Sequence, residues 1–155
     1  MDYYKLGRQN LDAQNLSAAD DLFLTGFAQG DPRCAYGLVA LAAISGKPME
    51  QPLEKLRESL PVIESLAERG DAEACFILGR CHETGSAAPQ SLPDTIRWYL
   101  QAASLGHVDA MFNLGCVYMT LGPEARQLAL DQFRQAADHG SQNAKLALAH
   151  YHGRI

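Results

Sequence analysis

The chain has 155 residues, of which 47% are hydrophobic and 20% are charged, and this balance is typical of a folded globular domain rather than a disordered segment. Its 13 basic and 18 acidic side chains give a net charge of −5, which disfavours a nucleic-acid-binding surface. The sequence contains no run of about 18 apolar residues, which a membrane span would require. The first residues after Met1 lack the apolar core of a signal peptide. We therefore expect a cytoplasmic protein that binds neither nucleic acid nor membrane.

In chain order, the hydrophobic periodicity and the capping residues predict nine helices. They are expected near residues 2–10, 17–28, 32–44, 52–69, 72–84, 94–104, 108–121, 123–138 and 142–152. Asp31, Asp71 and Ser141 are expected N-caps, and Ser17 begins a weak capping-box match. Pro61 interrupts the fourth helical pattern, so that helix is expected either to kink or to break there. The composition of residues 85–93 predicts a loop.

One pattern repeats along the whole chain, and four glycines mark it: Gly30, Gly70, Gly106 and Gly140. Four residues after each glycine stands a small residue, eight after it stands a leucine, and seven before it stands a large apolar residue. In column order these residues are Cys34, Ala74, Ala110 and Ala144; Leu38, Leu78, Leu114 and Leu148; and Phe23, Ile63, Tyr99 and Phe133. So many aligned columns indicate a repeat rather than chance.

The spacing of these columns has a direct structural interpretation. Positions four and eight after the glycine lie on one face of a helix, and the large apolar position lies on the helix before the glycine. The glycine is expected to end that helix with a positive φ. The repeat is therefore a pair of helices, and the chain is one all-α domain with units near 31–70, 71–106 and 107–140 and partial units at 1–30 and 141–155.

Two segments carry a resemblance to a known family. Residues 74–79 read Ala-Cys-Phe-Ile-Leu-Gly and residues 98–106 read Trp-Tyr-Leu-Gln-Ala-Ala-Ser-Leu-Gly, while residues 110–115 read Ala-Met-Phe-Asn-Leu-Gly. This pattern resembles Sel1-like repeats, which are relatives of tetratricopeptide repeats. The resemblance implies a right-handed α-α superhelix, a solenoid of about four helix pairs. It also implies a non-enzymatic adaptor or scaffold that holds a protein or peptide partner in a concave groove.

The resemblance to tetratricopeptide repeats also implies which positions line that groove, namely those 3, 6, 10 and 13 residues after each repeat glycine. They are Arg33, Tyr36, Ala40 and Ala43; Glu73, Phe76, Arg80 and Glu83; Asp109, Phe112, Cys116 and Met119; and Asn143, Leu146, His150 and Gly153. Large apolar anchors with a charged rim would suit a partner segment. The alternative for Phe76 and Phe112 is packing between helix pairs, and for Arg80 and Glu83 it is an ordinary solvated face.

The last predicted helix, at residues 142–152, lacks a partner helix within the repeat pattern. Leu146 and Tyr151 on this helix are candidates for self-association, which would make the protein a homodimer. Three interpretations stay open at this end: a cap, a docking surface for another chain, or a truncated array.

The sequence contains no catalytic or phosphate-binding motif, and we expect no catalytic residues, no cofactor and no metal site. The four cysteines Cys34, Cys75, Cys81 and Cys116 form no C-x-x-C pair and are expected to be reduced and mostly buried. Two further alternatives to the adaptor stay open. One is a dedicated inhibitor of a single partner protein. The other is a weak hydrolase, suggested by cysteine-rich secreted Sel1-like proteins whose disulfide pattern this chain lacks.

Overall fold

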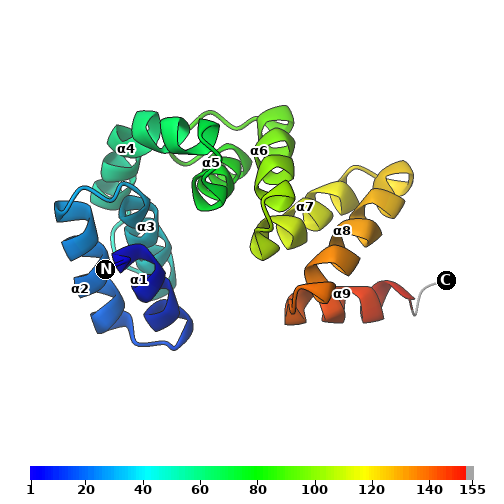
Figure 1. Cartoon of the computed structure of the whole chain (residues 1–155), viewed down its shortest axis with the longest axis horizontal. Coiled ribbons are helices and arrows are strands. Elements are labelled where there is room, and N and C mark those ends of the chain that lie inside the picture. The colour runs from blue at the N-terminus through cyan, green and yellow to red at the C-terminus, as the bar shows by residue number, and fades with distance from the viewer. Residues whose placement is uncertain (153–155) are drawn as a thin grey trace.

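A computed structural model describes residues 1–152, and within this range every regular element is helical. The helices curve into an arch, with α2 and α4 on its outside and α1, α3 and α5 on its inside (Figure 1). Their bounds are α1 Tyr3–Asp12, α2 Leu16–Ala28, α3 Arg33–Ser45, α4 Glu50–Glu68, α5 Ala72–Thr84, α6 Leu92–Ser104, α7 Val108–Thr120, the 3₁₀ turn η1 Pro123–Ala125, α8 Arg126–Asp138 and α9 Gln142–His152. The predicted all-α repeat fold is confirmed.

Local differences from the sequence prediction concern helix starts and one proline. The cap of α2 is Asn15, whose side chain accepts from the Ala18 N–H at 3.5 Å, so the capping box expected at Ser17 is wrong. Helix α4 runs unbroken through Pro61. Pro61 is exposed, so water can satisfy the carbonyl that the proline leaves unpaired. A 3₁₀ turn precedes α8, because Pro123 follows Gly122 directly and opens a tight turn first.

The four repeat glycines all join one unit to the next in the same way. Their φ angles lie between 86° and 95° for Gly30, Gly70, Gly106 and Gly140. At the second link, the Gly70 N–H donates to the Ala67 carbonyl and the Asp71 N–H donates to the Leu66 carbonyl, both at 3.0 Å. This is the Schellman arrangement, and the same pair of bonds recurs at the other three links. The prediction that these glycines end a helix with a positive φ is thus confirmed.

In the α5–α6 and α7–α8 pairs the two helices approach closely because an aromatic ring of the second helix lies on a glycine of the first. A Cβ added to Gly79 would lie 2.4 Å from the Tyr99 ring, and one added to Gly115 would lie 2.6 Å from the Phe133 ring. The rings of Tyr99 and Phe133 are 0% and 1% exposed. This contact therefore helps to hold these two helix pairs together.

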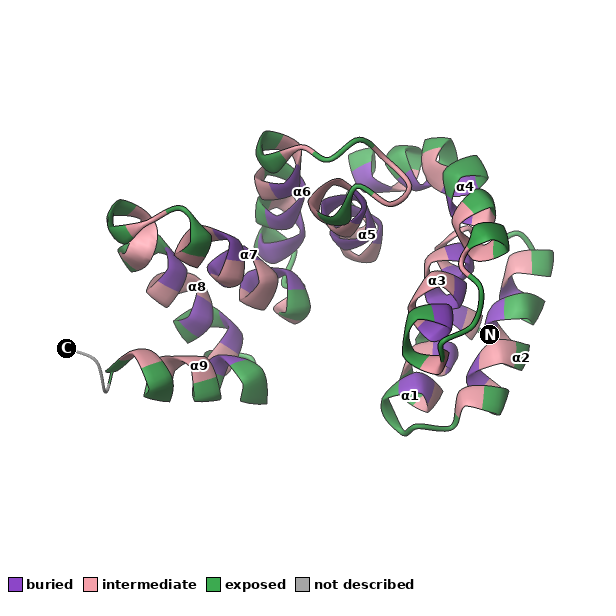
Figure 2. Ribbon diagram, turned by 180° about the vertical axis from the view of Figure 1, so that it is seen from behind, coloured by how far each residue is buried: buried purple, intermediate pink, exposed green. Residues whose placement is uncertain are grey.

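Burial is uneven along the solenoid, as Figure 2 shows. Helix α5 buries residues 74–79 and Cys81, because it packs on α3, α4 and α6. Helix α9 packs mainly on α8, and among its described residues only Ala144 is buried. Among the described helices, none is long and apolar enough to cross a membrane.

Candidate partner-binding surface

The positions expected to line the groove lie on the first helix of each pair, and most of them gather around three hollows on these helices. We name these the α1 hollow, the α3–α5 hollow and the α5–α7 hollow, and together they make up the inner strip. Positions at offset 3 line the α1 hollow, whereas positions at offsets 6, 10 and 13 line the other two hollows.

The α1 hollow encloses about 340 Å³ and has charged walls. It collects three of the four residues at offset 3, namely Arg33, Glu73 and Asp109, from α3, α5 and α7. Its other lining residues come from the N-terminal segment, and sequence reasoning did not identify them as site residues: Asp2, Tyr4, Lys5, Arg8 and Asp12. The sequence signal for α1 was the apolar stripe of Tyr4, Gly7 and Leu11 at helical spacing, all three buried in the structure.

Glu73 contacts several other residues around this hollow. Its Oε1 accepts a hydrogen bond from the Tyr4 hydroxyl at 2.7 Å, and its Oε2 lies 2.8 Å from His107 Nε2. Arg8 adds a longer ion pair with Glu73 at 3.8 Å and one with Asp109 at 3.9 Å. The carboxylate therefore ties α1 and the start of α7 to α5.

The proton on His107 can be placed from its two partners. The Ala110 backbone N–H donates to His107 Nδ1 at 3.2 Å, which requires an unprotonated Nδ1. The neutral ring therefore carries its proton on Nε2 and donates it to Glu73. Burial raises the pKa of Glu73, but the hydrogen bonds from His107 and Tyr4 and the positive charge of Arg8 outweigh burial and hold that pKa below its usual value.

The α3–α5 hollow also encloses about 340 Å³, and its lining is mainly apolar. Tyr36, Ala40 and Ala43 of α3 face Arg80 of α5 across it. The remaining lining residues are Val39, Ile44, Met49, Leu56, Cys81, Thr84 and Ser86. Ile44 is 55% exposed, so an apolar surface is open to a partner here.

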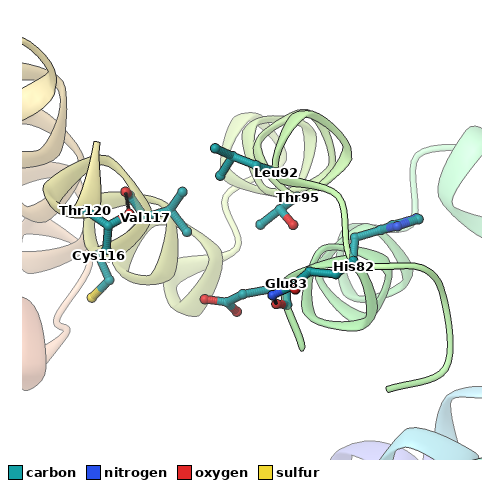
Figure 3. A pocket seen from close by; sticks show the side chains of 8 residues that line it. His82, Glu83, Leu92, Thr95, Cys116, Val117 and Thr120 are labelled. Carbon is teal, nitrogen blue, oxygen red and sulfur yellow. Dashed lines mark hydrogen bonds between the residues drawn. The ribbon is translucent and has the colours of Figure 1, made fainter. Parts of the chain in front are cut away.

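The α5–α7 hollow is larger, at about 540 Å³ (Figure 3). The predicted groove residues Glu83 and Cys116 reach it from α5 and α7. Its other lining residues are His82, Gln90, Leu92, Thr95, Val117 and Thr120. Glu83 Oε2 accepts from the Tyr99 hydroxyl at 2.6 Å and from Arg80 Nη1 at 2.8 Å. Burial and the Glu83 carboxylate together raise the pKa of Tyr99 well above its usual value.

The two aromatic anchors expected in the groove have different surroundings. The Phe76 side chain is 4% exposed and stacks on the His107 ring at 4.5 Å, so Phe76 packs inside the protein and offers no surface to a partner. Phe112 is half-buried against Phe133, with ring centroids 5.7 Å apart. Packing, the alternative that the sequence left open, accounts for Phe76 fully and for Phe112 in large part.

The last predicted positions lie beyond the three hollows. Met119 is half-buried in the C-terminal core, while Asn143 and His150 on α9 are exposed. Leu146 on α9 is 70% exposed, but Tyr151 is half-buried and stacks on Phe133 with an interplanar angle of 5°. Gly153 lies outside the described residues.

The remaining reactive side chains include the four cysteines and His139. The thiols of Cys34, Cys75 and Cys81 are buried and that of Cys116 is half-buried, all four unpaired. His139 Nδ1 lies 2.8 Å from the Gln135 carbonyl, a contact within its own helix end. Across residues 1–152, no three His, Cys, Asp or Glu side chains are grouped so as to hold a metal ion.

Comparison with known proteins identifies the repeat. The Sel1 repeat family model matches residues 72–107 and 108–141. A comparison with curated proteins found no match.

Three solved structures have the same fold. A Sel1 repeat protein from Oxalobacter formigenes is 23% identical, with a TM-score of 0.60 over 96% of this chain and 58% of that one. The protective antigen c5321 of uropathogenic Escherichia coli, which displays an SLR fold, is 21% identical, with a TM-score of 0.62 over 99% of this chain and 33% of that one. Cysteine-rich protein B of Helicobacter pylori is 20% identical, with a TM-score of 0.57 over 86% of this chain and 95% of that one. The chain thus spans only part of the first two relatives. Residues 72–141 therefore consist of two Sel1 repeats, and the chain as a whole has the fold of solved Sel1 repeat proteins.

Proposed function

We propose that this protein is a non-enzymatic interaction module that holds a segment of a partner protein along the inner strip. Sel1 repeat proteins generally mediate protein–protein interaction. The observation that carries the proposal is that the hollows on the first helices remain open, although the core of every helix pair is complete without an occupant. The cytoplasmic location expected from the sequence stays a prediction.

The chemistry of the strip supports a protein segment as the occupant. The α3–α5 hollow offers apolar surface at Ile44, Ala40 and Val39, and the neighbouring hollows add charged groups at Glu83 and Arg33. Apolar surface with a charged rim is the usual composition of a peptide-binding site. Stacked helix pairs also keep this surface rigid, so a partner does not have to order it on binding.

A steric block at the α3–α5 hollow tests the proposal. Ala40→Trp fills this hollow from α3, and Val62→Trp adds the same side chain at an exposed position of α4. A partner captured from source cells by the wild type and by Val62→Trp, but lost by Ala40→Trp, would support binding along the strip. A partner retained by both variants, with both folded by circular dichroism, would contradict it.

Self-association through α9 is a second candidate function, favoured by the 70% exposure of Leu146. Leu146→Glu places a charge at this position without touching the core. Multi-angle light scattering at several concentrations would then show a dimer for the wild type and a monomer for the variant. A wild-type monomer at every concentration would refute this candidate. Tyr151 is unsuitable for this test because it packs on Phe133.

A further inference from the structure

The two threonine hydroxyls around the α5–α7 hollow use their hydrogens inside the protein, and the Gln90 amide uses one of its two. The Thr95 hydroxyl donates to the Ser91 carbonyl at 2.8 Å, and the Thr120 hydroxyl donates to the Val117 carbonyl at 2.7 Å. The Gln90 amide nitrogen donates to the Glu83 carbonyl at 3.0 Å. The two hydroxyls therefore offer only oxygen lone pairs, and Gln90 offers its amide oxygen beside one remaining N–H, so the hollow presents mainly hydrogen-bond acceptors.

Glu83 adds a negative charge to these acceptors. Its side chain extends from α5 toward α7 across the hollow, whereas the His82 ring points away from it (Figure 3). Arg80 and Tyr99 both bind Glu83 Oε2, and no group within residues 1–152 donates a hydrogen bond to Oε1. The side chain of Glu83 is 30% exposed, so a ligand can reach the free oxygen.

We propose that the α5–α7 hollow takes the cationic side chain of a lysine or arginine on the partner segment. This inference rests on the proposed function, since that segment is the one held along the inner strip. A cation supplies only donors, which matches a lining made mainly of acceptors, and a charge-assisted hydrogen bond to Glu83 Oε1 is the strongest contact available there. Leu92 and Val117 line the same hollow and offer apolar surface to the methylene stem of either side chain. The net charge of −5 favours the approach of a basic segment.

Selection from a random peptide library displayed on phage tests the inference without a known partner. Peptides selected on the wild type are expected to share a lysine or arginine at one fixed position. Fluorescence anisotropy then measures each synthetic peptide against its neutral counterpart, with norleucine for lysine or citrulline for arginine. We expect the neutral peptide to bind the wild type roughly tenfold more weakly, the scale of one charge-assisted bond at a partly exposed site.

Two Glu→Gln substitutions distinguish binding in the α5–α7 hollow from a general electrostatic attraction between the peptide and the acidic protein. Glu83→Gln removes the charge but leaves an amide oxygen for the Tyr99 hydroxyl, and Glu58→Gln removes a charge at an exposed position of α4. The tenfold preference for the basic peptide should disappear in Glu83→Gln and persist in Glu58→Gln. Thermal unfolding monitored by circular dichroism checks that both variants are folded.

The outcomes distinguish this inference from the proposed function. Peptides that lose binding in Ala40→Trp but carry no fixed basic residue would refute the cationic site and leave the binding strip standing. Equal effects of Glu83→Gln and Glu58→Gln would likewise refute the cationic site. Selected peptides that bind Ala40→Trp as well as the wild type would contradict the proposed function itself.

Discussion

Gly79→Ala is a sensitive test of how the α5–α6 pair is held together. The added Cβ would lie 2.4 Å from Tyr99 Cδ1 and 2.5 Å from Tyr99 Cε1, far inside van der Waals contact. Tyr99 is 0% exposed and its hydroxyl is held by Glu83 at 2.6 Å, so the ring has little room to move away. The helices must separate or the ring must leave its rotamer.

The magnitude follows from two opposing effects. Overpacking a well-packed core costs about 1–3 kcal/mol, and the fixed ring places Gly79 at the upper end of that range. Alanine in place of glycine in a helix interior contributes about 1 kcal/mol in the stabilising direction. The free energy of unfolding should therefore fall by about 2 kcal/mol, which lowers the Tm of a chain this long by roughly 4–8 °C.

A double-mutant cycle measured by thermal and urea unfolding isolates the contact. In a Tyr99→Ala background the ring is gone, so Gly79→Ala should be neutral or stabilising by up to about 1 kcal/mol. If Gly79→Ala leaves the wild type equally stable, or destabilises both backgrounds alike, the account of the glycine–aromatic contact is wrong.

Three further predictions concern single side chains. Gln14 has a φ of +62°, so Gln14→Gly should raise stability by about 0.5–1 kcal/mol in thermal unfolding, whereas Gln14→Ala, which keeps a Cβ, should not. Cys116 is the half-buried cysteine and should be the first thiol to react with a disulfide reagent in the folded protein. Because burial raises its pKa above the usual value, the rate should keep rising with pH beyond about 9, and equal reactivity of all four thiols would contradict this. The lowered pKa of Glu73 adds stability above the unfolded-state value of about 4.3, and this stability is lost as pH falls through the folded pKa. Urea unfolding from pH 7 to pH 3 should therefore show a shallower acid loss for Glu73→Gln, and identical pH profiles would refute the role given to Glu73.

The sequence determined the fold because its signals are local. A glycine with positive φ, a small residue one turn later and a leucine two turns later specify a helix pair within a single unit, and the same signals recur in four units. Gly70 with Asp71 is an example: one ends a helix and the other caps the next, using atoms no more than five residues away. Such signals need no knowledge of distant neighbours.

The inner strip depends on contacts between units, and only the tertiary structure decided these. Tyr4 and Glu73 are 69 residues apart in the chain, and their hydrogen bond links α1 to α5, which the repeat alignment could not show. Phe76 occupies a predicted groove position, but the His107 ring of the next unit stacks on it and takes the surface that a partner would have used. The repeat pattern determines which face of each helix turns inward. Whether a side chain on that face stays free or is already in contact depends on its neighbours in the adjacent units, because packing is set by distance in space rather than in sequence.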